Sequence, residues 1–331
     1  MKHSISELKK SIPQSAFVPS LPRSLFYFFW DVSLLALLYY AMLNYGSVWM
    51  FPIFWFAAGT IMWALFVVGH DCGHGSFSHV TWINFLFGHL AHTPLLVPFH
   101  GWKVSHRTHH NHTGDIDKDE SWHPLTETQY KSLSPLAKIA RYKFFLIVFP
   151  LYLFVRSSGR DGSHFLPSSP LFPRGERKHA VTSLLWMIGM VCFLVWVTWQ
   201  YGFLFFISYY FLPYTVFVVW LSLVTFLHHT DVNIPWYRGK DWNYAKGALS
   251  TVDRSYGIFE PIHHNIGTHV VHHLFPTIPH YQLKFAKSHL KKLLGPEYRE
   301  SNESIRKVFF RSASECIIVP DSGGKVFFRK P

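Results

Sequence analysis

The sequence is poor in charge, in acidic residues and in cysteine. Only 15% of its 331 residues are charged, against about 25% in ordinary soluble domains, which argues against both a typical soluble protein and a disordered one. The three cysteines, Cys72, Cys192 and Cys316, are too few and odd in number for a disulfide framework. Asp and Glu together number 19, fewer than the 23 histidines.

The charge balance and the N-terminus limit the classes of partner and location. A net charge of +12 suits an anionic membrane surface or an acidic protein partner. Nucleic acid is the weaker interpretation because so much of the chain is apolar. Residues 1–24 are polar and basic, without the short apolar run of a secretory signal or a clear transit-peptide pattern. This favours a bacterial, cyanobacterial-type membrane.

Four apolar stretches approach the roughly 20 residues that a membrane-spanning helix needs. Short uncharged connections join the first to the second and the third to the fourth, which predicts two transmembrane hairpins. The four predicted spans are residues 25–44, 47–68, 181–199 and 203–227.

The distribution of Lys and Arg predicts how these hairpins are oriented. Basic residues avoid both hairpin tips and crowd into the N-terminus, into 100–178 and into the tail after 238. The positive-inside rule therefore predicts a multi-pass protein with both termini in the cytoplasm. The expected fold is a single all-α membrane domain over 1–331, in which cytoplasmic segments 69–180 and 228–331 form a helical cap.

Eight of the histidines are grouped at helical spacing. The first set has the spacing i, i+4, and the other two have the spacing i, i+3, i+4, which places the rings on one face of a helix. The predicted topology brings all three sets to the cytoplasmic side, together with the pair His228–His229 at the end of the fourth span. The three sets are His70 and His74; His106, His109 and His110; and His269, His272 and His273.

These histidines predict a site for two metal ions. Eight grouped imidazoles and one of the adjacent pair make nine ligands, too many for one ion. Imidazole suits zinc, copper, iron and nickel, but a zinc protease of the HExxH type needs a Glu where this chain has Asp71. A two-metal, all-histidine site with open positions fits redox iron better than hydrolytic zinc.

We call the three sets the first, second and third histidine boxes. Other polar residues near these boxes are candidates for orienting the metal ligands through hydrogen bonds. We expect most of the remaining histidines, including His89, His92 and His100, to lie at the surface or the membrane interface. Asp31, inside the first span, is expected to be an interfacial or hydrogen-bonded acid. The candidates for orienting ligands are Asp71, Asp115, Asp119, Glu120, His112 and His264.

The boxes and their surroundings resemble the membrane fatty acid desaturases of the acyl-lipid type. The likeness covers nearly the whole chain and is closest to the omega-3 (Δ15-type) branch. It rests on HDCGHGSFS (70–78), HRTHHNHTGDIDKDESW (106–122), HHTD (228–231), the segment from 250 to 281 that contains HVVHH, and VPDSGGKVFF (319–328).

The resemblance implies a di-iron centre held by the eight box histidines, with no catalytic side chain beyond the metal site. A ninth ligand at the end of the fourth span matches His229 better than His228, which is then a further candidate for orienting ligands. The implied reaction inserts a cis double bond into a dienoic acyl chain of a membrane glycerolipid, converting a linoleoyl to an alpha-linolenoyl group. It uses O₂ and two external electrons, from ferredoxin or from a cytochrome of the b5 type.

Alternatives remain at this point. An omega-6 (Δ12) desaturase or a hydroxylase could use the same scaffold. A histidine-rich metal transporter would need polar residues along a path through the membrane, and an intramembrane metalloprotease would bind zinc rather than iron.

Overall fold

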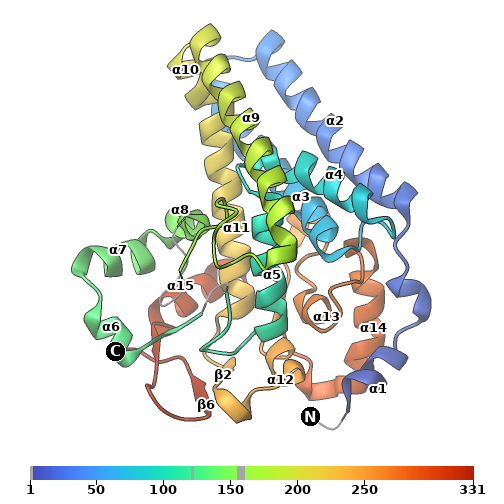
Figure 1. The fold of residues 1–331 in the computed structure, drawn as a ribbon, viewed down its shortest axis with the longest axis vertical. Helices are drawn as coiled ribbons and strands as arrows, with labels where there is room; N and C mark the ends of the chain where they lie inside the picture. Colours follow the sequence, from blue (N-terminus) through green and yellow to red (C-terminus); the bar gives the residue numbers. More distant parts are fainter. Residues whose placement is uncertain (1–2, 121–122, 155–160) are drawn as a thin grey trace.

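A computed structural model describes residues 3–120, 123–154 and 161–331. Long helices extend from one end of the molecule, and shorter helices and loops gather in a cap at the other end (Figure 1). Among the described residues, four segments are long and apolar enough to cross a membrane when the short turns that adjoin the helices are included. The four predicted spans are therefore confirmed as apolar helices and are longer than expected. The long helices are α2 (Leu21–Tyr45), α3 (Phe51–His74), α9 (Arg177–Tyr201) and α11 (Leu212–His229).

The remaining elements are short. A four-residue helix and a π-helical turn, Ile207–Phe211, precede α11. The shorter helices are α1 (Ile5–Lys10), α4 (Thr81–His92), α5 (Phe99–His112), α6 (Glu127–Ser132), α7 (Pro135–Lys143), α8 (Phe145–Val148), α10 (Phe203–Phe206), α12 (Tyr244–Ala248), α13 (His269–Leu274), α14 (Leu283–Leu294) and α15 (Ile305–Glu315).

In the part of the chain that the structure describes, three two-stranded pairings, which the sequence did not predict, connect distant parts of the cap. Each strand has only two or three residues, too few for a period-two hydrophobic pattern. In this way the C-terminal tail is fixed to loops that follow α5 and α11. The pairs are β1 (Leu125–Thr126) with β5 (Ile318–Val319), parallel; β2 (Pro235–Tyr237) with β6 (Lys325–Phe327), antiparallel; and β3 (Asp253–Arg254) with β4 (Glu300–Ser301), parallel.

Helix α3 is the centre of the bundle. It packs against α2, α4 and α11, and from Ala58 to Cys72 every residue is buried. In contrast, α2 and α9 leave most of their apolar side chains exposed or only half-buried, as expected for helices surrounded by hydrocarbon rather than water. Gly75, with φ +71°, ends α3 in the left-handed conformation that glycine adopts without strain.

The first histidine box is the last turn of α3 rather than a separate segment after it. Glycine has low helix propensity, but at Gly73 the lack of a side chain serves packing. A Cβ atom at this position would lie 2.8 Å from the Trp102 ring. The glycine therefore lets α5, which carries the second box, approach the end of α3 closely.

The N-terminus belongs to the cap. Leu8 and Ile12 are buried in one hydrophobic cluster with Leu283 and Leu290 of α14, and Figure 1 shows α1 beside α14. The cap is therefore built from three parts of the sequence, not only from the two segments that follow the hairpins.

The expectation that the remaining histidines lie at the surface is wrong for several of them. His89, His92 and His100 are at most 3% exposed. The Nε2 atom of His92 lies 3.1 Å from the carbonyl oxygen of Phe66, and its ring stacks on the Phe66 ring. A neutral imidazole can fill the interior as an aromatic ring while it satisfies a backbone group.

Candidate metal centre

Four helices bring the grouped histidines together at the junction of the bundle and the cap. The first box is the last turn of α3, the second lies on α5, the third opens α13, and His229 is the last residue of α11. Because each box has the spacing of one helical turn, its rings project from one side of its helix.

The first group contains five histidines from three boxes. One nitrogen from each lies within 4.8 Å of all the others. The Nε2 atom of His110 is 3.1 Å from Nε2 of His106 and 3.0 Å from Nε2 of His272. The members are His70, His74, His106, His110 and His272.

The second group is adjacent and contains His109, His229 and His273, again with one nitrogen each within 4.8 Å of the others. The Nε2 atom of His269 lies 3.0 Å from Nε2 of both His229 and His273. The rings of His110 and His273 stack with centroids 4.1 Å apart, so the two groups are direct neighbours. All nine histidines named by the sequence are therefore brought together.

The spacing of these nitrogens fits metal coordination. Two nitrogens bound at right angles to one ion, at about 2.1 Å each, lie about 3.0 Å apart. Moreover, Nε2 of His74 is buried without a hydrogen-bond partner among the described residues. Burial, reinforced by neighbouring imidazoles, lowers the pKa of His106, His110 and His272 well below the ordinary histidine value. The rings are therefore neutral, which is the form that binds a metal.

Two side chains orient members of the second group. The Nδ1 atom of His109 lies 2.6 Å from Oδ1 of Asp119, which is completely buried. The Nδ1 atom of His273 lies 3.0 Å from the Thr113 hydroxyl, which itself donates to the His109 carbonyl. Each contact occupies the nitrogen that faces away from the group and leaves Nε2 directed inward. Asp119 was predicted for this purpose, whereas nothing in the sequence singles out Thr113.

His228 and His229 are adjacent but have different surroundings. The Nδ1 atom of His228 lies 2.6 Å from the Val252 carbonyl oxygen, and its Nε2 lies 3.1 Å from the Tyr256 hydroxyl. Both ring nitrogens are thus engaged away from the histidine groups, while His229 joins the second group.

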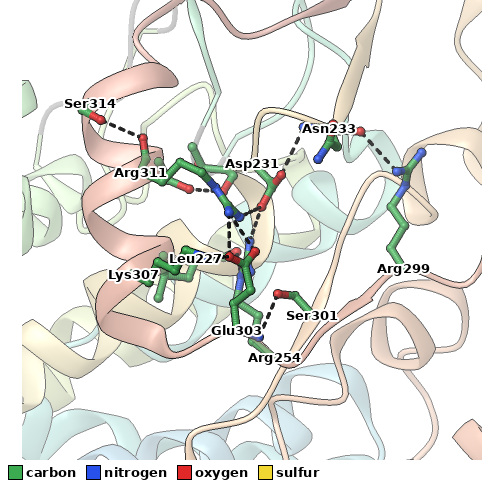
Figure 2. A network of polar contacts seen from close by, with 12 residues as sticks. Leu227, Asp231, Asn233, Arg254, Arg299, Ser301, Glu303, Lys307, Arg311 and Ser314 are labelled. Carbon is green, nitrogen blue, oxygen red and sulfur yellow. Dashed lines mark hydrogen bonds and ion pairs between the residues drawn. The ribbon is translucent and has the colours of Figure 1, made fainter.

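A network of polar contacts fixes the end of α11, where His229 lies. The buried Arg254 guanidinium donates to the Leu227 carbonyl at 2.6 Å and forms an ion pair with Asp231 at 2.8 Å. Figure 2 shows Arg311 of α15 reaching the same carboxylate while it also binds Glu303. The Leu227 carbonyl is one of the last of the helix, and Arg254 caps it.

Asp71 and His264 belong to a second buried network. The Oδ2 atom of Asp71 accepts from both the backbone N–H and Nδ1 of His280, and its Oδ1 lies 3.9 Å from Nδ1 of His70. His264 instead pairs with Asp31 of α2, at 2.7 Å, so Asp31 is a hydrogen-bonded acid. The ring of His264 contacts the ring of His280, with centroids 4.7 Å apart, so His264 does not orient a box histidine directly.

The other candidates lie near the site but have different contacts. Asp115 is buried and accepts from the Asp117 N–H, and the ring of His112 lies 5.4 Å from that of Trp242. Glu120 is buried; burial and the Glu120 charge together raise the pKa of the Tyr152 hydroxyl.

An apolar cavity of about 60 Å³ adjoins the histidines. Aromatic rings of α3, α5 and the turn before residue 154 line it, as do aliphatic side chains of α11. Such a cavity can hold hydrocarbon directly beside the nitrogens and exclude water from them. The residues that line it include Trp63, Phe66, Trp102, Tyr152, Leu221 and Val224.

Comparison with known proteins identifies the family. The family profile "Fatty acid desaturase" matches residues 46–304. The chain is 54% identical, over 99% of its length and 91% of the relative, to the "sn-1 acyl-lipid omega-3 desaturase (ferredoxin)" of Synechocystis sp.. A protein of the same name from Nostoc sp. is 53% identical over 98% of this chain and 90% of its own. The "Acyl-lipid omega-3 desaturase (cytochrome b5), endoplasmic reticulum" of Arabidopsis thaliana is 44% identical over 98% and 86%. The chain with these converging histidines therefore belongs to the fatty acid desaturase family.

Proposed function

We propose that this protein is an acyl-lipid omega-3 desaturase, which converts a dienoic chain such as linoleoyl to the trienoic alpha-linolenoyl chain. The observation that carries this proposal is that nine imidazoles form two adjacent groups beside an apolar cavity. The names of the relatives support omega-3 selectivity and a glycerolipid substrate.

The overall reaction balances with O₂ and an electron donor. The acyl chain loses two hydrogen atoms. Together with O₂, two electrons and two protons, these hydrogen atoms form two molecules of water. A saturated C–H bond offers no acidity to a general base, so acid–base side chains alone cannot break it. A bound pair of iron ions supplies the oxidising chemistry.

We assign the ions to the two histidine groups. His70, His74, His106, His110 and His272 would hold one ion, and His109, His229, His269 and His273 would hold the other. The chain's own residues do the rest. Asp119 and Thr113 fix the rings of His109 and His273, and the apolar cavity wall holds methylene groups and keeps water out.

The location proposed for the site is the cytoplasmic face of a cyanobacterial-type membrane. The cap carries most of the basic residues, and the positive-inside rule supports a cytoplasmic location for it and for both termini. There the site can receive an acyl chain from the bilayer and electrons from a soluble donor. Ferredoxin is the proposed donor, because it is named for two of the most similar relatives.

Expression in a host fed linoleate or oleate tests the function, with fatty acids profiled by gas chromatography and with His109→Ala as the inactive control. We expect linoleate to be converted to alpha-linolenate by the wild type only. Conversion of oleate alone would assign the chain to the omega-6 branch, and a hydroxylated product would indicate a hydroxylase.

Metal analysis of the purified protein tests the cofactor separately. We expect about two irons per chain. About one zinc and no iron would contradict the assignment and favour a metalloprotease. Membership of the fatty acid desaturase family speaks against both a protease and a transporter.

A further inference from the structure

A polar cavity of about 410 Å³ lies directly behind the third histidine box. Gly267 and Thr268 line it, and the next residue is His269. Asp253, on the cavity wall, accepts from the Val270 N–H at 2.8 Å. Only the first turn of α13 therefore separates this cavity from the second histidine group.

One face of α14 gives this cavity its positive rim. The helix buries Leu283, Ala286, Leu290 and Leu294 against the cap, and the face that adjoins this buried stripe carries lysines at the cavity. The lysines that line the cavity are Lys284, Lys287 and Lys291, and the first and third of these are exposed.

Two of the three acidic residues that line the cavity, Asp253 and Glu300, are paired with lysines, and the third is Glu260. Lys287 lies 2.9 Å from carboxylate oxygens of both Asp253 and Glu300, and Lys291 lies 2.6 Å from Glu300. Arg254, a further lining residue, pairs with Asp231. Lys284 is exposed, and the Lys291 side chain stays 51% exposed although it pairs with Glu300, so an approaching molecule meets both ammonium groups.

Helix α1, which packs against α14, carries two further exposed lysines. Leu8 packs into the hydrophobic cluster of α14, which places Lys9 and Lys10 beside that helix, and both are exposed. Lys292 is exposed at the end of α14. We call this the α1–α14 surface, made of Lys9, Lys10, Lys284, Lys291 and Lys292.

We propose that the α1–α14 surface docks an acidic one-electron carrier protein and that electrons enter the site through the turn Thr268–His269. Electron transfer slows steeply with distance, so the best docking surface is one that combines charge attraction with the thinnest wall over the acceptor. The inference rests on the proposed function, because only a redox site needs a donor. Each docked carrier is oxidised by one electron, and two docking events supply the two electrons that one turnover requires.

Binding of a redox-inactive carrier tests the surface without turnover. The probe is a plant-type ferredoxin with gallium in place of iron, titrated at low salt against the full chain in nanodiscs of zwitterionic lipid. We expect Lys284→Glu with Lys291→Glu to weaken binding about tenfold or more and to flatten its salt dependence. The matched control is Lys131→Glu with Lys143→Glu on α6 and α7, which makes the same change of charge and should alter affinity less than about twofold.

Equal weakening by both pairs of substitutions, or by neither, would overturn the proposal. A loss of affinity seen only when the nanodisc lipids are anionic would assign the surface to lipid headgroups instead.

Turnover adds a second readout: the KM for ferredoxin should rise, whereas kcat at saturating ferredoxin should not change. If linoleate is not desaturated but gallium ferredoxin binds here, the docking inference survives and the proposed function fails. If linoleate is desaturated but the Lys284→Glu/Lys291→Glu variant binds gallium ferredoxin as the wild type does, the proposed function survives and the docking inference fails.

Discussion

Asp31 and His264 are 233 positions apart in the sequence, yet Oδ2 of Asp31 lies 2.7 Å from Nε2 of His264 in the interior of the protein. The pair connects α2, which contributes none of the grouped histidines, to the loop that leads into the third box. Through the ring contact between His264 and His280, and the hydrogen bonds from His280 to Asp71, it continues to the first box.

Breaking this pair on one side should destabilise the protein strongly. Asp31→Leu leaves His264 buried without its partner, and removal of one member of a buried pair costs about 3–5 kcal/mol. We expect Asp31→Leu/His264→Leu to be more stable than Asp31→Leu alone, since no buried polar group is then left unpaired. Thermal unfolding of the detergent-solubilised variants measures both. A double variant no more stable than the single one would contradict this interpretation.

Asp119→Asn should impair metal binding while the fold is retained. The substitution keeps the size of the side chain but removes the charge that holds Nδ1 of His109, and loss of such partners typically lowers metal affinity or activity about 10–100-fold. Iron content after dialysis against a weak chelator measures the effect. Asp117→Asn, at an exposed position two residues away, is the control and should retain iron as the wild type does.

The two adjacent histidines of α11 should respond differently to substitution. His229→Ala removes a member of the second group, and we expect iron to fall to about one per chain. His228→Phe keeps an aromatic ring but loses the contacts with Val252 and Tyr256, which should cost about 1–3 kcal/mol of stability and leave the iron content nearly unchanged. Iron analysis and thermal unfolding of both variants would show the reverse pattern if His228 were the ligand.

Arg254→Met should loosen the end of α11 in a pH-dependent way. Burial opposes ionisation of Asp231, but the Arg254 hydrogen bond and other contacts outweigh it and lower the pKa of this carboxyl. A lowered pKa contributes stability that is complete above the unfolded value of about 3.9 and is lost as the pH falls through the folded value. The variant should therefore be less stable than wild type at pH 7, and this difference should shrink below about pH 4. Unfolding temperatures across this range provide the test.

The helices and the grouped histidines could be predicted because their signals are local. An apolar run of 20 residues or a box such as HRTHH is complete within a few turns of one helix, so the four spans and the convergence of the nine histidines follow from pattern and topology. Asp119 was predicted for a related reason, since it follows His109 by ten residues.

The contacts that orient the site could not be predicted, because their partners are distant in sequence and ordinary in type. Nothing near Asp31 indicates His264, and Thr113 differs from other threonines only by its position beside His273. Burial of His89, His92 and His100 depends on aromatic neighbours from separate helices. The two- and three-residue strands form by pairing with segments that are distant in the sequence, and such short strands have no local pattern that predicts them.

The order of the histidines along the chain determines when both histidine groups can be complete during synthesis. The five-membered group lacks His272, and the other group lacks both His269 and His273, until α13 has left the ribosome. By then both hairpins have already been translated and can be inserted. We therefore expect both groups to fill with metal only after α13 has been made, because a polypeptide truncated before α13 lacks three of the nine histidines.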